Sequence, residues 1–223
     1  MIERFMQQLP AFLLSLPIIL FALSAHEAAH GYVAYRLGDP TARNFGRLTL
    51  NPLKHLDPIG FLCMVIFHFG WAKPVPVVTR NFKNPRRDMA LTGIAGPITN
   101  LLIAFLHVLA VRIFTPIINR VDPMVFQSNT FLAMVASLFL TFLYTGVTLN
   151  LSLAVFNLLP VPPLDGSRFC YVFLPAKWYF GIMKYEQYIS IAIMLMLVTG
   201  FLDGPLGWAV GSLETLMFKL VGW

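Results

Sequence analysis

The sequence contains very few charged residues. Asp, Glu, Lys and Arg make up 12% of its 223 residues, whereas hydrophobic residues make up 57%. An ordinary soluble domain carries about 25% charged residues. This shortage of charge excludes a typical soluble globular domain and favours a chain that folds in a lipid bilayer.

Cysteine is almost absent, and acidic residues are outnumbered by basic ones. Cys63 and Cys170 are distant from each other and form no CxxC motif, which excludes a disulfide framework and a zinc ribbon. The net charge is +6, and nine of the 16 basic residues lie between Arg36 and Arg87. Such clustering is typical of a cytoplasmic connection in a membrane protein. Because no RNA-binding motif accompanies it, we expect no nucleic-acid partner.

Long uncharged runs predict the membrane-spanning helices. A span needs roughly 20 apolar residues. The sequence satisfies this requirement at residues 9–37, where only Glu27 and Arg36 carry charge, at 89–114 and at 129–157. A shorter run at 187–202 predicts a fourth span.

The segment 38–87, between the first two spans, has a different composition. It is rich in proline and glycine, with strand-like "RLTL" and "VPVV" on either side of an apolar stretch, 61–69. We expect a small β-containing, membrane-associated hairpin region around a re-entrant segment. The alternative is that 57–72 forms a short or tilted true span.

The stretch "HEAAH" places a carboxylate between two imidazoles inside the first span. Residues four apart project from one face of a helix, so His26 and His30 converge as two ligands of a tetrahedral Zn²⁺ must. Glu27 lies further around the helix, where it can act as a general base. This is the HExxH arrangement of zinc peptidases.

The apolar surroundings favour a metal at this motif. HExxH also occurs by chance on soluble helices, but a buried carboxylate in a bilayer costs at least ~2.5 kcal/mol. No basic residue lies within one helical turn of Glu27 to neutralise it. A divalent cation and a water-filled pocket would remove that cost.

Asp165 is the candidate for a third ligand. It ends an uncharged run of 42 residues, follows a proline-rich break and is expected on the same membrane side as the end of the first span. Alternatively, Asp165 caps a helix that begins at Gly166. Spacing alone leaves both interpretations open.

Three motifs in this order resemble the site-2 protease family of intramembrane zinc metallopeptidases: "HEAAHG" (26–31), "GPITN" (96–100) and "FNLLPVPPLDG" (156–166). "NPLKHLDPIG" and "GWAKPVPV" resemble a compact bacterial subgroup without PDZ or CBS domains. The resemblance implies one Zn²⁺ per chain, with ligands and catalytic residues as follows: His26, His30 and Asp165 as ligands, Glu27 as catalytic base and Asn157 as a donor to the oxyanion.

Other polar and small residues have more than one interpretation. His55 is a possible auxiliary residue near the metal or the substrate, although a hydrogen-bonded loop histidine is the simpler alternative. Gly93 and Gly96 are expected to allow close helix packing. Asn100 is expected to hold helices together.

These features predict an all-α polytopic membrane protein with a three-helix catalytic core. One peptidase domain would cover 1–223, with its core at about 9–175 and a C-terminal transmembrane or interfacial segment at 185–223. The expected activity is zinc-dependent endoproteolysis of membrane proteins or transmembrane peptides, which the strand-like segments 47–50 and 74–79 could hold by edge addition. A metal-binding transporter or sensor is the alternative.

The distribution of basic residues also predicts location. If 38–87 is cytoplasmic, two further crossings return 158–184 to the same side. We therefore expect a protein of the cell membrane, such as a bacterial inner membrane, with its active site toward the cytoplasm. The sequence does not indicate an oligomeric state.

Overall fold

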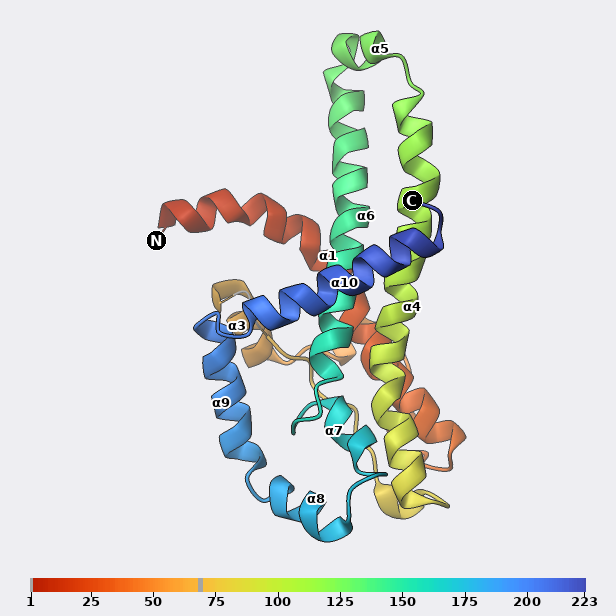
Figure 1. The fold of residues 1–223 in the computed structure, drawn as a ribbon, viewed down its shortest axis with the longest axis vertical. Coiled ribbons are helices and arrows are strands. Elements are labelled where there is room, and N and C mark those ends of the chain that lie inside the picture. Colours follow the sequence, from red (N-terminus) through yellow and green to blue (C-terminus); the bar gives the residue numbers. More distant parts are fainter. Residues whose placement is uncertain (1, 68–69) are drawn as a thin grey trace.

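Three long helices dominate the computed structural model, which describes residues 2–67 and 70–223 (Figure 1). They are α1 (Ile2–Arg36), α4 (Pro85–Asn119) and α6 (Thr130–Asn157). α4 and α6, together with the part of α1 from Leu9 onward, are long and apolar enough to cross a membrane. The predicted multi-pass helical membrane protein is confirmed at this level.

α4 lies between the other two spans and contacts both. In its middle, the small side chains of Ala104 and Val108 are fully buried against Val147 and Leu151 of α6. Small interface residues let helix backbones approach closely, which is how membrane helices gain packing energy. α1 packs against the N-terminal half of α4, where the glycines lie, and this places the HEAAH motif at a three-helix junction.

The remaining helices are shorter and connect or flank the spans. In chain order they are α2 (Thr41–Asn44), η1 (Pro52–Lys54), α3 (Pro58–Phe67), η2 (Thr79–Asn81), α5 (Pro123–Ser128), α7 (Asp165–Cys170), α8 (Ala176–Met183), α9 (Glu186–Val198) and α10 (Asp203–Leu220). α9 is too short to cross alone, and it meets α10 at a bend of 80°. The predicted fourth span therefore exists only if this bent pair crosses as one unit. α10 runs across α6 and α4, where Val210 joins their core (Figure 1).

The described helix in the apolar segment after residue 57 is too short to cross a membrane by itself. α3 has ten residues and rises about 15 Å, half the thickness of a bilayer core. Gly70 lies close to Gly60, near the start of α3. A Cβ added at Gly70 would lie only 2.2 Å from the carbonyl oxygen of Gly60. Residues 68–69 of the predicted segment lie outside the described part. Whether 57–72 is re-entrant or a short span stays a prediction.

The expected β structure is not found in the described residues of 38–87. They contain no strand, and their one isolated antiparallel bridge joins Leu56 to Ala72. At 74–79 Pro74 and Pro76 explain this, because proline has no N–H to donate to a ladder. Substrate binding by edge addition at 74–79 stays a prediction.

Side chains supply most of the contacts that hold residues 73–78, which we call the strap, and Lys73 N also donates to the carbonyl oxygen of His55 at 2.7 Å. Successive backbone groups of the strap face the protein and pair with three side chains from different parts of the chain. These contacts run from Arg47 Nη2 to Lys73 O (2.5 Å), from Val75 N to Glu27 Oε2 (2.8 Å) and from Val78 N to Asp39 Oδ2 (2.7 Å). The strap thereby crosses α1 beside the HEAAH motif.

Asp39 is the most highly bonded of these side chains. It is fully buried and accepts hydrogen bonds from Thr41, Val78 and Asn81. Burial alone would raise the pKa of Asp39, but these hydrogen bonds outweigh it and hold the pKa below the ordinary 3.8. A lowered pKa means that the ionised carboxylate stabilises the fold.

We expect Asp39→Asn to destabilise the protein and to remove one source of its acid sensitivity. The wild-type contribution is complete above about pH 4 and is lost as the pH falls through the lowered pKa of the folded state. Losing hydrogen bonds to a buried carboxylate should cost about 1–3 kcal/mol. Thermal unfolding in detergent between pH 3 and 7 measures both effects. Asp122→Asn, at the exposed α5 cap, is the control. An unchanged pH dependence in Asp39→Asn would contradict the assignment.

Candidate metal centre

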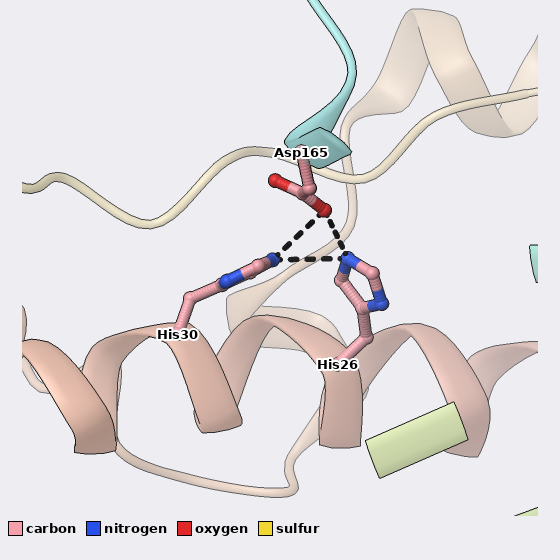
Figure 2. A group of neighbouring side chains, drawn as sticks. All are labelled: His26, His30 and Asp165. Carbon is pink, nitrogen blue, oxygen red and sulfur yellow. Dashed lines mark hydrogen bonds and ion pairs between the residues drawn. The ribbon is translucent and has the colours of Figure 1, made fainter. Parts of the chain in front are cut away.

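The structure brings His26, His30 and Asp165 together at one point (Figure 2). Both imidazoles project from one face of α1, as the i, i+4 spacing predicts. Prolines after Asn157 end α6 and turn the chain back, so that Asp165, the first residue of α7, faces them. Asp165 Oδ2 lies 3.0 Å from His26 Nε2 and 3.1 Å from His30 Nε2, and the two Nε2 atoms are 3.0 Å apart.

The second nitrogen of each imidazole has an acceptor as its partner. His26 Nδ1 lies 2.5 Å from Asn100 Oδ1, and His30 Nδ1 lies 2.6 Å from the carbonyl oxygen of Thr92. An acceptor at Nδ1 requires a proton on that nitrogen, so each neutral ring presents an unprotonated Nε2. The tautomers follow from these partners. Both α1 histidines are thus oriented by α4.

The donor set fits zinc. Two imidazole nitrogens and one carboxylate oxygen, all on buried side chains, lie close together. With both rings neutral, each of the three atoms presents a lone pair and none carries a proton, so the three atoms repel one another. A cation relieves that repulsion. Two histidines and one carboxylate form a standard three-ligand set of catalytic Zn²⁺, in which the fourth position stays open. The role of each residue as a ligand stays a prediction.

The alternative role for Asp165 receives no support from the local geometry. The residue before α7 is Leu164, and it makes no side-chain capping bond. Asp165 lies inside the first turn, where its Oδ2 is directed at the two imidazoles (Figure 2). Its carboxylate therefore contacts two histidines that precede it in the sequence by 135 and 139 residues.

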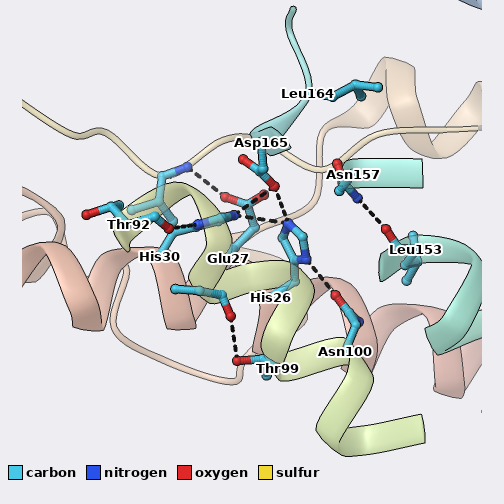
Figure 3. Close-up of polar contacts among 12 residues, drawn as sticks. His26, Glu27, His30, Thr92, Thr99, Asn100, Leu153, Asn157, Leu164 and Asp165 are labelled. Carbon is cyan, nitrogen blue, oxygen red and sulfur yellow. Dashed lines mark hydrogen bonds and ion pairs between the residues drawn. The ribbon is translucent and has the colours of Figure 1, made fainter. Parts of the chain in front are cut away.

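Glu27 lies beside the imidazole pair and is only half-buried. Its Oε2 accepts a hydrogen bond of 2.8 Å from the backbone N–H of Val75 in the strap. Figure 3 shows the carboxylate on the same side of α1 as the histidines. The strap thus fixes one oxygen and orients the other. This arrangement suits a general base that must meet a water at a defined position.

Asn157 and His55 make other contacts. Asn157 Nδ2 donates to the carbonyl oxygen of Leu153 at 2.9 Å, so the amide folds onto its own helix (Figure 3). His55 is 2% exposed, and its Nε2 lies 2.8 Å from the carbonyl oxygen of Thr49. That contact is expected of a hydrogen-bonded loop histidine. The oxyanion role of Asn157 and the auxiliary role of His55 stay predictions.

Two residues of α4 contribute more to the site than their sequence interpretation as packing elements implies. A Cβ at Gly96 would lie 2.5 Å from the Nε2 atoms of both His26 and His30. Asn100, fully buried, contacts His26 directly. Both lie in "GPITN", so the motif itself was the available signal, but which side chains they meet follows only from the helix packing.

Comparison with known proteins agrees with this geometry. The profile of Peptidase family M50 matches residues 11–202. A Bacillus subtilis protein with the curated name "Putative zinc metalloprotease YwhC" is 40% identical over 189 residues, which cover 85% of this chain and 80% of that protein. Rip2 of Mycolicibacterium smegmatis, curated with the same description, is 28% identical over 92% of this chain and 70% of its own length. MJ0611 of Methanocaldococcus jannaschii, described likewise, is 27% identical over 71% of this chain and 75% of its own. No solved structure matches.

Proposed function

Because the chain belongs to peptidase family M50 and is a zinc-dependent intramembrane protease, we propose that His26, His30 and Asp165 hold its Zn²⁺. The observation that supports this is the approach of the two Nε2 atoms and Asp165 Oδ2 to within 3.0–3.1 Å of one another. Bound Zn²⁺ lowers the pKa of water to about 7 and polarises a peptide carbonyl.

Glu27 is the general base of this proposal. Its carboxylate takes a proton from the attacking water and returns it to the leaving amine, which requires one free, oriented oxygen. The hydrogen bond from Val75 N provides that orientation by holding Oε2. The strap therefore acts as a support for the base.

Asn157 provides a donor for the oxyanion. Its amide lies at the end of α6, close in sequence to Asp165, and in the present conformation donates to Leu153 O. A side-chain rotation would release this donor when substrate binds. Side-chain amides serve in this way in other oxyanion holes.

The substrates are membrane-embedded proteins or transmembrane peptides, and the active site opens toward the cytoplasm. The cluster of basic residues at 36–87 supports this orientation, because it lies at the end of α4 nearest Gly96 and the histidine pair. The protein lies in a cell membrane, such as a bacterial inner membrane. A single peptidase domain over 1–223, with its core at about 9–175, accommodates all of these elements.

Zinc content tests the ligand set. We expect about one Zn²⁺ per chain in the purified wild type, and less than a tenth of that content in His26→Ala and in Asp165→Ala. Thr141→Ala is the control, because Thr141 is exposed on α6 and its hydroxyl donates to the carbonyl oxygen of Ser137 on its own helix. Elemental analysis of detergent-purified protein provides the measurement. Full zinc content in His26→Ala would refute the proposal.

A further inference from the structure

We propose that Asn150, which does not touch the metal site, is a positioning residue that fixes the tautomer of His26 through Asn100. This inference rests on the proposed role of His26 as a zinc ligand. It assigns a function in metal binding to a residue of α6, two side chains away from the nearest ligand.

A continuous chain of hydrogen bonds carries the inference. His26 Nδ1 lies 2.5 Å from Asn100 Oδ1, Asn100 Nδ2 donates to Asn150 Oδ1 at 3.0 Å, and Asn150 Nδ2 donates to the carbonyl oxygen of Gly146 at 2.8 Å. Figure 3 shows the first of these contacts. Both asparagines are 0% exposed. The chain links α1, α4 and α6 without any exposed member.

The direction of this chain is fixed from its far end. A backbone carbonyl only accepts hydrogen bonds, so the Gly146 oxygen requires the NH₂ group of Asn150 to face it. Asn150 Oδ1 then faces Asn100, which must turn its own NH₂ toward it. Reversing either amide would place two oxygens or two N–H groups opposite each other.

A second acceptor supports the same orientation of Asn100. Its Nδ2 also approaches the carbonyl oxygen of Ala22, on α1, at 3.5 Å. Two acceptors on different helices therefore surround this NH₂ group. The amide oxygen is left to face His26, which must then carry its proton on Nδ1.

The two histidines thus obtain the same tautomer in different ways. His30 donates directly to the Thr92 carbonyl, whereas His26 is linked to the Gly146 carbonyl through two amides. Partners of this kind orient a ligating histidine and raise its affinity for metal. The competing explanation is that the two amides only hold helices together.

Zinc affinity separates the two explanations. In full-length protein purified in detergent, competition with a chelator should show zinc binding 10–100-fold weaker in Asn100→Leu and about tenfold weaker in Asn150→Leu. Ser152→Ala is the control on α6, since its hydroxyl bonds only Thr148 O of its own helix.

A second readout does not depend on zinc. In zinc-free protein with ¹⁵N-labelled histidine rings, the His26 signals, identified by their loss in His26→Ala, should report the Nδ1-protonated tautomer in wild type and a mixture in Asn150→Leu. Helix pinning alone predicts a lower melting temperature with unchanged zinc affinity and tautomer, and that result would overturn the inference. Full zinc binding by His26→Ala would instead refute the ligand assignment beneath it.

Discussion

Gly96→Ala should abolish zinc binding and proteolysis together. The added Cβ would lie 2.5 Å from the Nε2 atoms of His26 and His30 and 2.6 Å from His26 Cε1. These are contacts that real Cβ atoms do not make, so either the rings or α4 must move. The rings are the predicted ligands, and turning them away removes their nitrogens from Asp165.

Retreat of α4 does not relieve the clash at low cost. The acceptors that orient the two histidines, Asn100 Oδ1 and Thr92 O, are on α4 itself. Moving the helix outward would break both contacts and leave buried N–H groups without partners, at about 1–3 kcal/mol each. A single methyl group therefore disrupts the site by either route.

Zinc analysis and cleavage assays on the purified variant check this prediction. We expect less than a tenth of the wild-type zinc, and a loss of activity of at least about 10³-fold, since metal ions contribute several kcal/mol to transition-state stabilisation. Gly207→Ala is the matched control, because a Cβ there meets nothing within 4 Å. Normal zinc content in Gly96→Ala would show that the close approach of α4 is unimportant.

Gly93→Ala should have a smaller effect than Gly96→Ala, because its Cβ meets α7 and not the imidazoles. The nearest atoms would be Arg168 Cβ at 2.9 Å and Asp165 O at 3.1 Å. Displacement of α7 by a few tenths of an ångström shifts one of the three predicted ligands and leaves the histidine pair in place. Comparing the zinc content of the two variants tests whether Gly96 faces the imidazoles and Gly93 faces α7.

The spans and the histidine pair could be predicted from sequence because their causes are local. An uncharged run long enough to cross a bilayer fixes α4 and α6 within a few residues, and the helical repeat alone brings His26 and His30 to one face. Asp165 was different. Only the turn after α6 distinguishes a residue facing the histidines from a helix cap, and that turn depends on packing across the molecule.

The strap shows where pattern reasoning fails. Alternating "VPVV" is typical of a strand, but Pro74 and Pro76 lack the N–H groups that a ladder needs. The N–H groups of Val75 and Val78 instead donate to Glu27 and Asp39, which precede the strap by more than 30 residues. Backbone-to-side-chain bonds of this range leave no periodic signal in the sequence, so the support of Glu27 by Val75 could not be predicted.

Glu27→Gln should remove catalysis and keep the metal. Glutamine has the size of glutamate, and its amide oxygen still accepts the hydrogen bond from Val75 N, so the strap stays in place. The three predicted ligands are unchanged. The amide cannot take a proton from water, and the loss of a general base costs about 10²–10⁴ in rate.

Two measurements check this expectation: the zinc content of the purified variant, and the accumulation of uncleaved membrane proteins in cells that carry Glu27→Gln, followed by quantitative proteomics. Glu214→Gln, on α10 beside Tyr144 and Phe218, is the control that should change neither. Loss of zinc in Glu27→Gln would mean that the carboxylate holds the site together and is more than a base. Full turnover with full zinc would assign proton transfer to another group. Because the Val75 contact survives the substitution, neither outcome can be attributed to release of the strap.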